Sequence, residues 1–222
     1  MDVRVTDLLY QAQIKEFDEH FERVRSSRVP VVWVSALVLC PMKWRLMLRY
    51  PEIARACFRG SFVLGKLAHV GLQRFLMECA TMLGFEWIEC EVPVEKSVAL
   101  SDGSVAIVSG RIDALARKNG ERIVIEFKTA RSDRGLPHQH HVEQLRIYMN
   151  MVNASRGILL YVTPDRVAEY EYDEPMNNEE LAQLVESFIK AEKAPRFDWE
   201  CNYCLYAPLC PRKIVNTRCN PL

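Results

Sequence analysis

The spacing of apolar residues predicts helices in the first third of the chain. Residues 1–28 place apolar side chains at helical intervals among many charges, which predicts an amphipathic helix or a pair of helices. Ser35 is expected to cap a helix that begins at Ala36 and continues into Cys40, and residues 61–83 predict a long helix. Apolar residues at Val63, Leu67, Val70, Phe75 and Met82 suit this long helix.

The rest of the chain alternates between β-prone runs and helical patterns. Strands are expected at residues 85–100, 105–113, 157–163 and 167–172 and in a hairpin within 110–129, and helices at 138–155 and from a cap at Asn178 to about Lys193. A strand, a helix and a strand in succession predict a right-handed crossover with parallel pairing. The fold class expected is therefore α/β: a mixed central β-sheet flanked by helices, with a cysteine-rich tail.

The central hairpin carries the first chemical signal. Asn119-Gly120 between two β-prone runs is typical of a type I′ turn, because both residues of that turn need positive φ. In the resulting register Asp113 lies directly opposite Glu126, with Cβ atoms about 4.5–5.5 Å apart, and Lys128 leaves the same face. Two carboxylates in that position repel each other unless a cation lies between them, which favours a divalent metal site. The alternative is a solvated polar face with a salt bridge to Lys128. Apolar residues occupy the opposite face: Ile123, Ile125 and Phe127.

Composition narrows the class of protein. The 222 residues suit one domain, and zero net charge means that any nucleic-acid surface must be a local patch. The longest apolar stretch, Val31–Cys40, is too short to cross a bilayer, and the N-terminus shows no secretory signal pattern. Eight cysteines in such a chain favour thiols or metal ligands over disulfides, so we expect a cytoplasmic protein without membrane contact.

Three of the cysteines form the second chemical signal. Cys201, Cys204 and Cys210 have the spacing Cys-x2-Cys-x5-Cys, one thiolate short of a zinc site or an iron–sulfur cluster. Cys40 is the best fourth ligand, since it precedes a proline as Cys210 does. The alternative fourth ligands are Cys57, Cys79, Cys90 and Cys219, of which Cys79 and Cys90 are more simply buried small hydrophobes.

Two further groups are candidates for phosphate contact. Basic residues with interleaved aromatic residues suggest a strand-binding surface; they are Arg45, Arg49, Arg55, Arg59 and Lys66, with Trp44 and Tyr50. Solvated helix faces have the same composition. The histidines that lead into the predicted helix at 138–155 are also expected near phosphates or adventitious metal ions: His138, His140 and His141.

Together these features resemble the PD-(D/E)xK nucleases. Asp113, followed on the next strand by Glu126-Phe127-Lys128, resembles their D…(D/E)-x-K core. Gly65 to His69 resembles the G-x-x-x-H helix of the RecB-type branch, and Gln144 to Tyr148 its Q-x-x-x-Y helix. One cysteine before the core and three after it are similar to the iron–sulfur subgroup of that branch. A chain of this length without helicase motifs is most similar to the CRISPR-associated Cas-four exonucleases.

The resemblance implies roles for the hairpin residues and His69. Asp113, Glu126 and the backbone carbonyl of Phe127 are expected to supply oxygen ligands to Mg²⁺ or Mn²⁺. His69 is expected to add a nitrogen ligand, which favours Mn²⁺. Lys128 is expected to orient the attacking water or to stabilise charge on the phosphate.

Gln144 and Tyr148, four residues apart on one helix face, are expected to contact the DNA backbone or the active-site water. The alternative is a buried tyrosine beside a hydrogen-bonded glutamine. The resemblance also implies a structural iron–sulfur cluster on Cys40, Cys201, Cys204 and Cys210, with [4Fe–4S] favoured and [2Fe–2S] open.

The activity implied is a metal-dependent DNA exonuclease that acts on single-stranded ends or overhangs, from the 5′ side, and trims prespacers for CRISPR adaptation. The Cas-one and Cas-two integration proteins are the partners expected, and oligomeric state stays open. The alternatives are a non-catalytic DNA-end-binding module with zinc in its tail, or a DNA-repair nuclease of the same fold. Residues 1–222 are expected to be one nuclease domain, with a helical part at 1–60, a core at 61–193 and a cluster segment at 194–222.

Overall fold

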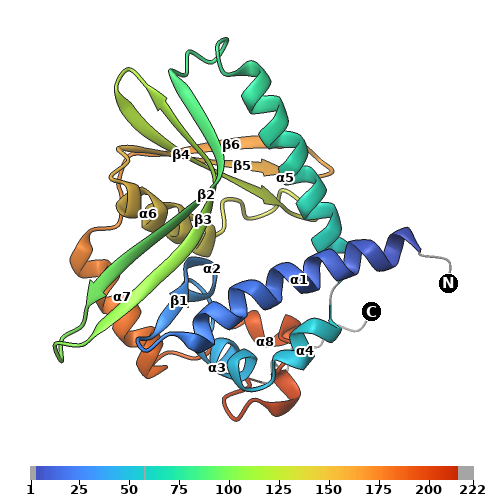
Figure 1. Cartoon of the computed structure of the whole chain (residues 1–222), viewed down its shortest axis with the longest axis vertical. Helices are drawn as coiled ribbons and strands as arrows, with labels where there is room; N and C mark the ends of the chain where they lie inside the picture. Colours follow the sequence, from blue (N-terminus) through green and yellow to red (C-terminus); the bar gives the residue numbers. More distant parts are fainter. Residues whose placement is uncertain (1–3, 58, 215–222) are drawn as a thin grey trace.

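Strand β3 (Val105–Lys118) is the centre of the sheet, because it pairs with three other strands. The computed structural model describes residues 4–57 and 59–214, and the strands within them form one six-stranded mixed sheet (Figure 1). The other strands are β1 (Val31–Trp33), β2 (Trp87–Ala99), β4 (Glu121–Thr129), β5 (Arg156–Val162) and β6 (Val167–Tyr172). The helices are α1 (Val5–Ser26), α2 (Val34–Leu37), α3 (Pro41–Arg49), α4 (Pro51–Ala56), α5 (Gly60–Cys79), α6 (Gln139–Val152), α7 (Asn178–Lys190) and α8 (Glu200–Tyr203), with a 3₁₀ turn η1 (Ala207–Leu209).

Two strands share one edge of β3 and leave a gap between them. Antiparallel β2 follows almost the whole length of β3, so β1 and β4 must share the opposite edge. Parallel β1 pairs with Ile107–Ser109 and antiparallel β4 with Ala114–Lys118. Within the described residues, Gly110–Asp113 therefore has no strand partner on this edge. The sheet opens at this point, and the side chains of the candidate site gather there.

The connection from β4 through α6 to β5 gives a parallel pair, in which Glu126 is the partner of Leu159. This confirms the predicted parallel pairing and the mixed sheet. The left-handed conformation of Asn119 and Gly120 (φ 53° and 81°) confirms the predicted hairpin turn.

Helices cover both faces of the sheet, as the sequence predicted (Figure 1). One face packs under α2, α6 and α7 around a large apolar cluster that includes Ile112, Leu145 and Phe188. The other face packs under α5 around a smaller cluster: Ala114, Ile123, Ile125 and Phe127. The hairpin residues expected to face the core do so. Within the described residues, no helix combines the length and the apolar character needed to cross a membrane. The expected division of the chain into three parts stays a prediction.

Helix α5 forms as predicted, although most of the apolar residues that predicted it do not face the core. Leu67, Val70 and Phe75 are exposed, and so is Met82 beyond the helix. Leu72 and Leu76 pack against the sheet instead, and Gln73 is buried. The helix is apolar on most of its surface, so the sequence pattern alone does not identify the side that meets the sheet.

Two helix boundaries also differ from expectation. A short helix begins at Val34 and ends at Leu37, before a separate helix starts at Pro41, where the sequence predicted one continuous helix from Ala36. A proline at the first helical position favours that restart. The cap of α7 is Asn177, whose side chain accepts a 2.8 Å hydrogen bond from the Glu180 backbone.

Candidate active site and cysteine cluster

The hairpin brings its two acidic side chains together. The pairing of Ala114 with Ile125 has the predicted register, and one further step along it places Asp113 opposite Glu126. Both side chains are buried, at 9% and 2% exposure. Two acidic groups therefore lie side by side where water cannot screen their repulsion.

Asp113 is held by groups from two elements, β4 and α5. Its Oδ2 accepts a 2.8 Å hydrogen bond from the backbone N–H of Phe127, and its Oδ1 lies 3.2 Å from His69 Nδ1 on α5. The backbone carbonyl of Asp113 accepts from Gln73, which also donates to Glu91. Burial acts to lower the pKa of His69, but the hydrogen bond and charge of Asp113 outweigh it, and the net shift is upward.

Glu126 has one satisfied oxygen and one orphaned oxygen. Its Oε1 accepts 2.7 Å hydrogen bonds from Lys128 Nζ and from Gln144 Nε2. Its Oε2 is buried and has no partner within the described residues. Burial, and after it the charge of Asp113, raises the pKa of Glu126 to about 7. A buried carboxylate oxygen without a partner costs about 1–3 kcal/mol or more, so this atom is suited to an added positive ligand.

The donor set fits a hard divalent cation. In the described part of the chain, no three His, Cys, Asp or Glu side chains are gathered closely enough to hold a metal ion as they stand. The orphaned Glu126 oxygen, the adjacent Asp113 and the nearby His69 nevertheless offer two carboxylates and one imidazole at one point. That combination suits Mg²⁺ or Mn²⁺.

Helix α6 supplies the predicted glutamine and tyrosine, and both are buried. Gln144 donates to Glu126 and accepts a 3.0 Å hydrogen bond from Lys128, so it joins the acidic and basic groups of the site. The Tyr148 hydroxyl accepts from the Arg111 backbone N–H at 3.3 Å, at the point where the edge of β3 is open. The ion pair expected between Lys128 and Glu126 is present as well.

Gly110 allows the close approach of Tyr148. A Cβ atom at residue 110 would lie 2.6 Å from Tyr148 Cε1 and 3.0 Å from Val34 Cγ2. We expect Gly110→Ala to lower the free energy of unfolding by about 1–3 kcal/mol, because a ring held in the core cannot move away without strain. Urea denaturation measures this. Gly71→Ala, in α5 with open space around it, is the control and is expected to leave stability unchanged or slightly raised. Equal stability of both variants would contradict this packing argument.

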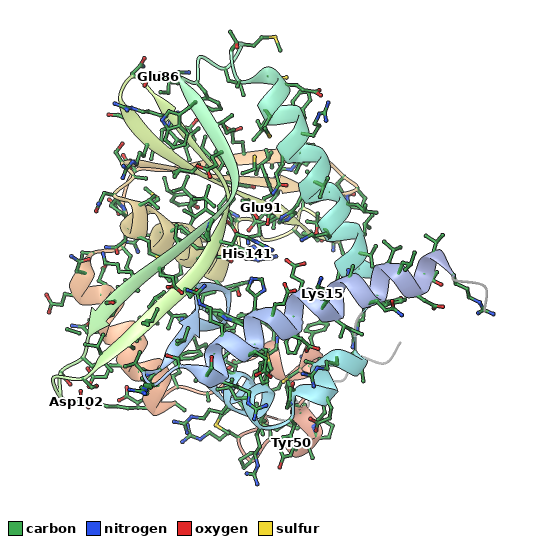
Figure 2. All side chains as sticks on the ribbon, in the orientation of Figure 1. Lys15, Tyr50, Glu86, Glu91, Asp102 and His141 are labelled. Atoms are coloured by element: carbon green, nitrogen blue, oxygen red, sulfur yellow. The ribbon has the colours of Figure 1, made fainter. Side chains whose placement is uncertain are left out.

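A groove of about 530 Å³ extends from the carboxylates to α1, and its lining includes His69, Asp113, Glu126, Lys128 and Tyr148. It also contains charged residues that the sequence analysis missed: Glu16, Glu91 and Arg111. Arg111 and Asp113 are two apart on one strand and therefore share a face, so the sequence could have placed Arg111 beside the carboxylates. Glu91 has a left-handed backbone conformation (φ 56°) in the middle of β2 (Figure 2). No sequence pattern predicted that its side chain lines the groove.

The predicted strand-binding surface does not form as one patch. Trp44 is buried in the core, Arg45 donates to the Ile189 carbonyl, and Arg55 pairs with Asp18. Lys66 reaches the groove and pairs with Glu16 there. The basic residues were predicted from adjacency in sequence, and the turns between α3, α4 and α5 direct them to different partners.

The histidines before and within α6 pack together. His141, shown in Figure 2, lies 2.7 Å from the Tyr161 hydroxyl, and the His140 and His141 rings are 4.1 Å apart. Burial lowers the pKa of His140 to about 4 and that of His141 to about 2. Both rings are therefore neutral at neutral pH and bring no positive charge to a phosphate.

The cysteine cluster brings together residues far apart in sequence. Cys40, Cys201, Cys204 and Cys210 line one cavity of about 70 Å³, together with residues of α3 and α8 such as Lys43 and Tyr203. Among the described cysteines, which are all free, Cys57, Cys79 and Cys90 do not line it, and Cys219 lies outside the described residues. Burial raises the pKa of the Cys40 and Cys204 thiols. Four thiols that line one cavity are the donors that zinc or an iron–sulfur cluster takes, although no three of the described side chains are close enough to hold a metal ion as they stand.

A buried glutamate attaches this segment to the start of α3. Glu200 Oε1 accepts the Cys40 N–H at 2.7 Å, and its Oε2 accepts the N–H groups of Arg196 and Phe197. The Arg196 side chain pairs with Glu143 of α6, next to Gln144. The sequence analysis missed Glu200 and Arg196, because their partners lie as far as 160 residues away.

Comparison with known proteins agrees with this geometry. The family model of the PD-(D/E)XK nuclease superfamily matches residues 76–211. The CRISPR-associated exonuclease Cas4 of Saccharolobus solfataricus is 40% identical over 203 residues, which cover 90% of this chain and 96% of that protein. The crystal structure of SSO0001 has a TM-score of 0.86 at 37% identity and covers 95% of this chain and 98% of its own. An alkaline exonuclease, LHK-Exo from Laribacter hongkongensis, has a TM-score of 0.49 at 11% identity, and the match covers 77% of this chain and 90% of that chain.

The fold, the buried carboxylates and the matching family model identify the class: the chain belongs to the PD-(D/E)XK nuclease superfamily, whose members use divalent metals. Within that class it belongs to the family of the CRISPR-associated exonuclease Cas4. The family predicted from the sequence is confirmed.

Proposed function

We propose that this protein is a divalent-metal-dependent exonuclease that degrades single-stranded DNA ends or overhangs from the 5′ side. One observation carries the proposal: Asp113 and Glu126 lie buried and adjacent at the opening of the sheet, and the orphaned Glu126 oxygen is left for a cation. The family of the chain supports the activity.

The residues of the site would act together on one phosphodiester. Asp113, Glu126 and His69 would hold Mg²⁺ or Mn²⁺, with the Phe127 carbonyl as a further oxygen ligand. When bound, such an ion supplies Lewis-acid stabilisation of phosphate charge and lowers the pKa of water. Lys128 lines the groove, and its ammonium group would orient the attacking water or neutralise charge on the phosphate.

Gln144 and Tyr148 would act as positioning residues in this scheme. Gln144 holds both Lys128 and Glu126, and Tyr148 holds the backbone of Arg111 at the open edge of β3. Their burial favours a role in orienting these groups over direct contact with DNA. The four cysteines would hold a structural iron–sulfur cluster. The cluster type that we favour is [4Fe–4S], and [2Fe–2S] is the alternative.

The biological setting that we propose is the trimming of prespacers in CRISPR adaptation with the Cas-one and Cas-two integration proteins, in the cytoplasm. The family named above supports this setting. A pull-down with tagged Cas-one and Cas-two would test it, since a DNA-repair nuclease would not retain them.

The test of activity uses single-stranded DNA labelled at either end, incubated with anaerobically purified protein. We expect degradation with Mn²⁺ or Mg²⁺ and none with excess EDTA, because the carboxylates alone cannot stabilise an anionic phosphate. A 5′ label is expected in short products from the earliest times, and a 3′ label in a ladder that shortens gradually. The reverse pattern would overturn the polarity. DNA that is bound but never cut would move the assignment to a non-catalytic end-binding module.

A further inference from the structure

Four charged side chains line the groove beside the carboxylates. Glu16 of α1 accepts from Lys66 Nζ at 3.1–3.2 Å and from Arg111 Nη2 at 2.5 Å. Arg111 Nε in turn lies 2.6 Å from Glu91 Oε2. The same groove contains Asp113, so these groups border the candidate active site.

Glu16 neutralises the cations that a nucleic-acid groove requires. Arg111 and Lys66 together carry two positive charges, and Glu16 and Glu91 cancel them. Arg111 pairs with Glu91 through its Nε and donates to Glu16 through its Nη2, so its guanidinium group is already oriented. The Glu16 carboxylate accepts from an arginine and a lysine, and these are the donors that also bind a backbone phosphate.

The contact with Glu16 is suited to exchange. The side chains of Glu16, Arg111 and Lys66 are 34%, 40% and 47% exposed, and pairs with this exposure contribute little to stability. Glu16 nevertheless stays ionised: burial acts to raise its pKa, but the hydrogen bonds from Arg111 and Lys66 outweigh burial and lower it. Helix α1 itself is peripheral, since Phe21 is the one residue of its described length that is fully buried.

The face of α1 that meets the groove is mostly polar along several turns, with Phe17 as its apolar member. Gln13, Glu16, His20 and Arg23 line the groove at helical spacing. The Gln13 side-chain oxygen is buried without a hydrogen-bond partner in the described residues. A polar face with an unsatisfied atom is suited to a polar ligand beneath the helix.

We propose that Arg111 and Lys66 form a binding site for a backbone phosphate of the DNA strand, and that Glu16 occupies this site in the free protein until the strand displaces it. The proposal rests on the proposed function, because it places the strand in the same groove as Asp113 and Glu126. Glu16 thus competes with DNA and limits affinity.

The test measures binding of a short labelled oligothymidylate by fluorescence anisotropy, in EDTA so that no cleavage occurs. We expect Glu16→Gln to bind about three- to tenfold more tightly, because it frees both cations while Arg111 keeps Glu91 as its partner. Glu19→Gln is the matched control, with the same change of charge on the same helix. Glu19 is 66% exposed and pairs with Lys15, and neither residue lines the groove, so the DNA affinity of the Glu19→Gln variant is expected to stay within about twofold of the parent.

A third variant tests the cations. Lys66→Gln is expected to weaken binding and to reduce the slope of log affinity against log salt by about 1, because one phosphate contact is lost. Unchanged or weaker binding by Glu16→Gln would overturn the proposal, and so would equal tightening by Glu19→Gln. Degradation of DNA by the parent protein with Mn²⁺, measured in parallel, distinguishes failure of this inference from failure of the proposed function.

Discussion

Replacing Glu126 by glutamine is expected to reduce metal-dependent DNA degradation by at least about a thousandfold. Glutamine keeps the shape of the side chain and can still accept from Lys128 and Gln144, the present partners of Oε1. It removes the negative charge and offers an amide where the orphaned Oε2 now lies. Loss of the several kcal/mol that a bound metal contributes to the transition state corresponds to this factor.

Glu121→Gln is the control, because Glu121 lies exposed on the same strand at the hairpin turn, opposite Lys118. It is expected to retain the parent rate. Calorimetric titration with Mn²⁺ gives a second measurement, in which Glu126→Gln should lose the binding heat that Glu121→Gln keeps. Parent-like activity in Glu126→Gln would show that the hairpin is not the active site or that a contaminant cuts the DNA.

Replacing Cys204 by serine is expected to remove the iron from the purified protein and to lower the free energy of unfolding by about 3–5 kcal/mol. A cluster on the four cysteines would link Cys40 to Cys201 across some 160 residues of chain. In a simple chain-entropy model, closing a loop of that size stabilises the fold by roughly 5 kcal/mol. Urea denaturation and iron and zinc analysis of anaerobically purified protein measure the two effects.

Cys79→Ser, at the end of α5 and away from the cavity, is the matched control. It is expected to keep the metal content of the parent. A parent protein with zinc and no iron would change the identity of the metal group but not its ligands. Equal metal content and stability in the Cys204 variant would show that these thiols bind no metal.

The sequence by itself determined the hairpin and its chemistry. A period of two and an Asn-Gly turn are local features, and together they placed Asp113, Glu126 and Lys128 on one face before any tertiary contact was known. The spacing of Cys201, Cys204 and Cys210 was equally local. His69 came from the resemblance to a family, since a single histidine in an apolar helix carries no signal of its own.

The tertiary structure decided the features that depend on how one helix or strand packs against another. The period of an apolar pattern fixes which side chains share a face but not which face meets the sheet, so the apolar residues that predicted α5 did not identify the side that it turns inward. The contact of Tyr148 with Arg111, beside Gly110, and the contact of Glu16 with Arg111 join residues 37 and 95 positions apart. Such contacts form because burial and charge pairing are satisfied for the whole chain at once, and local spacing does not record them.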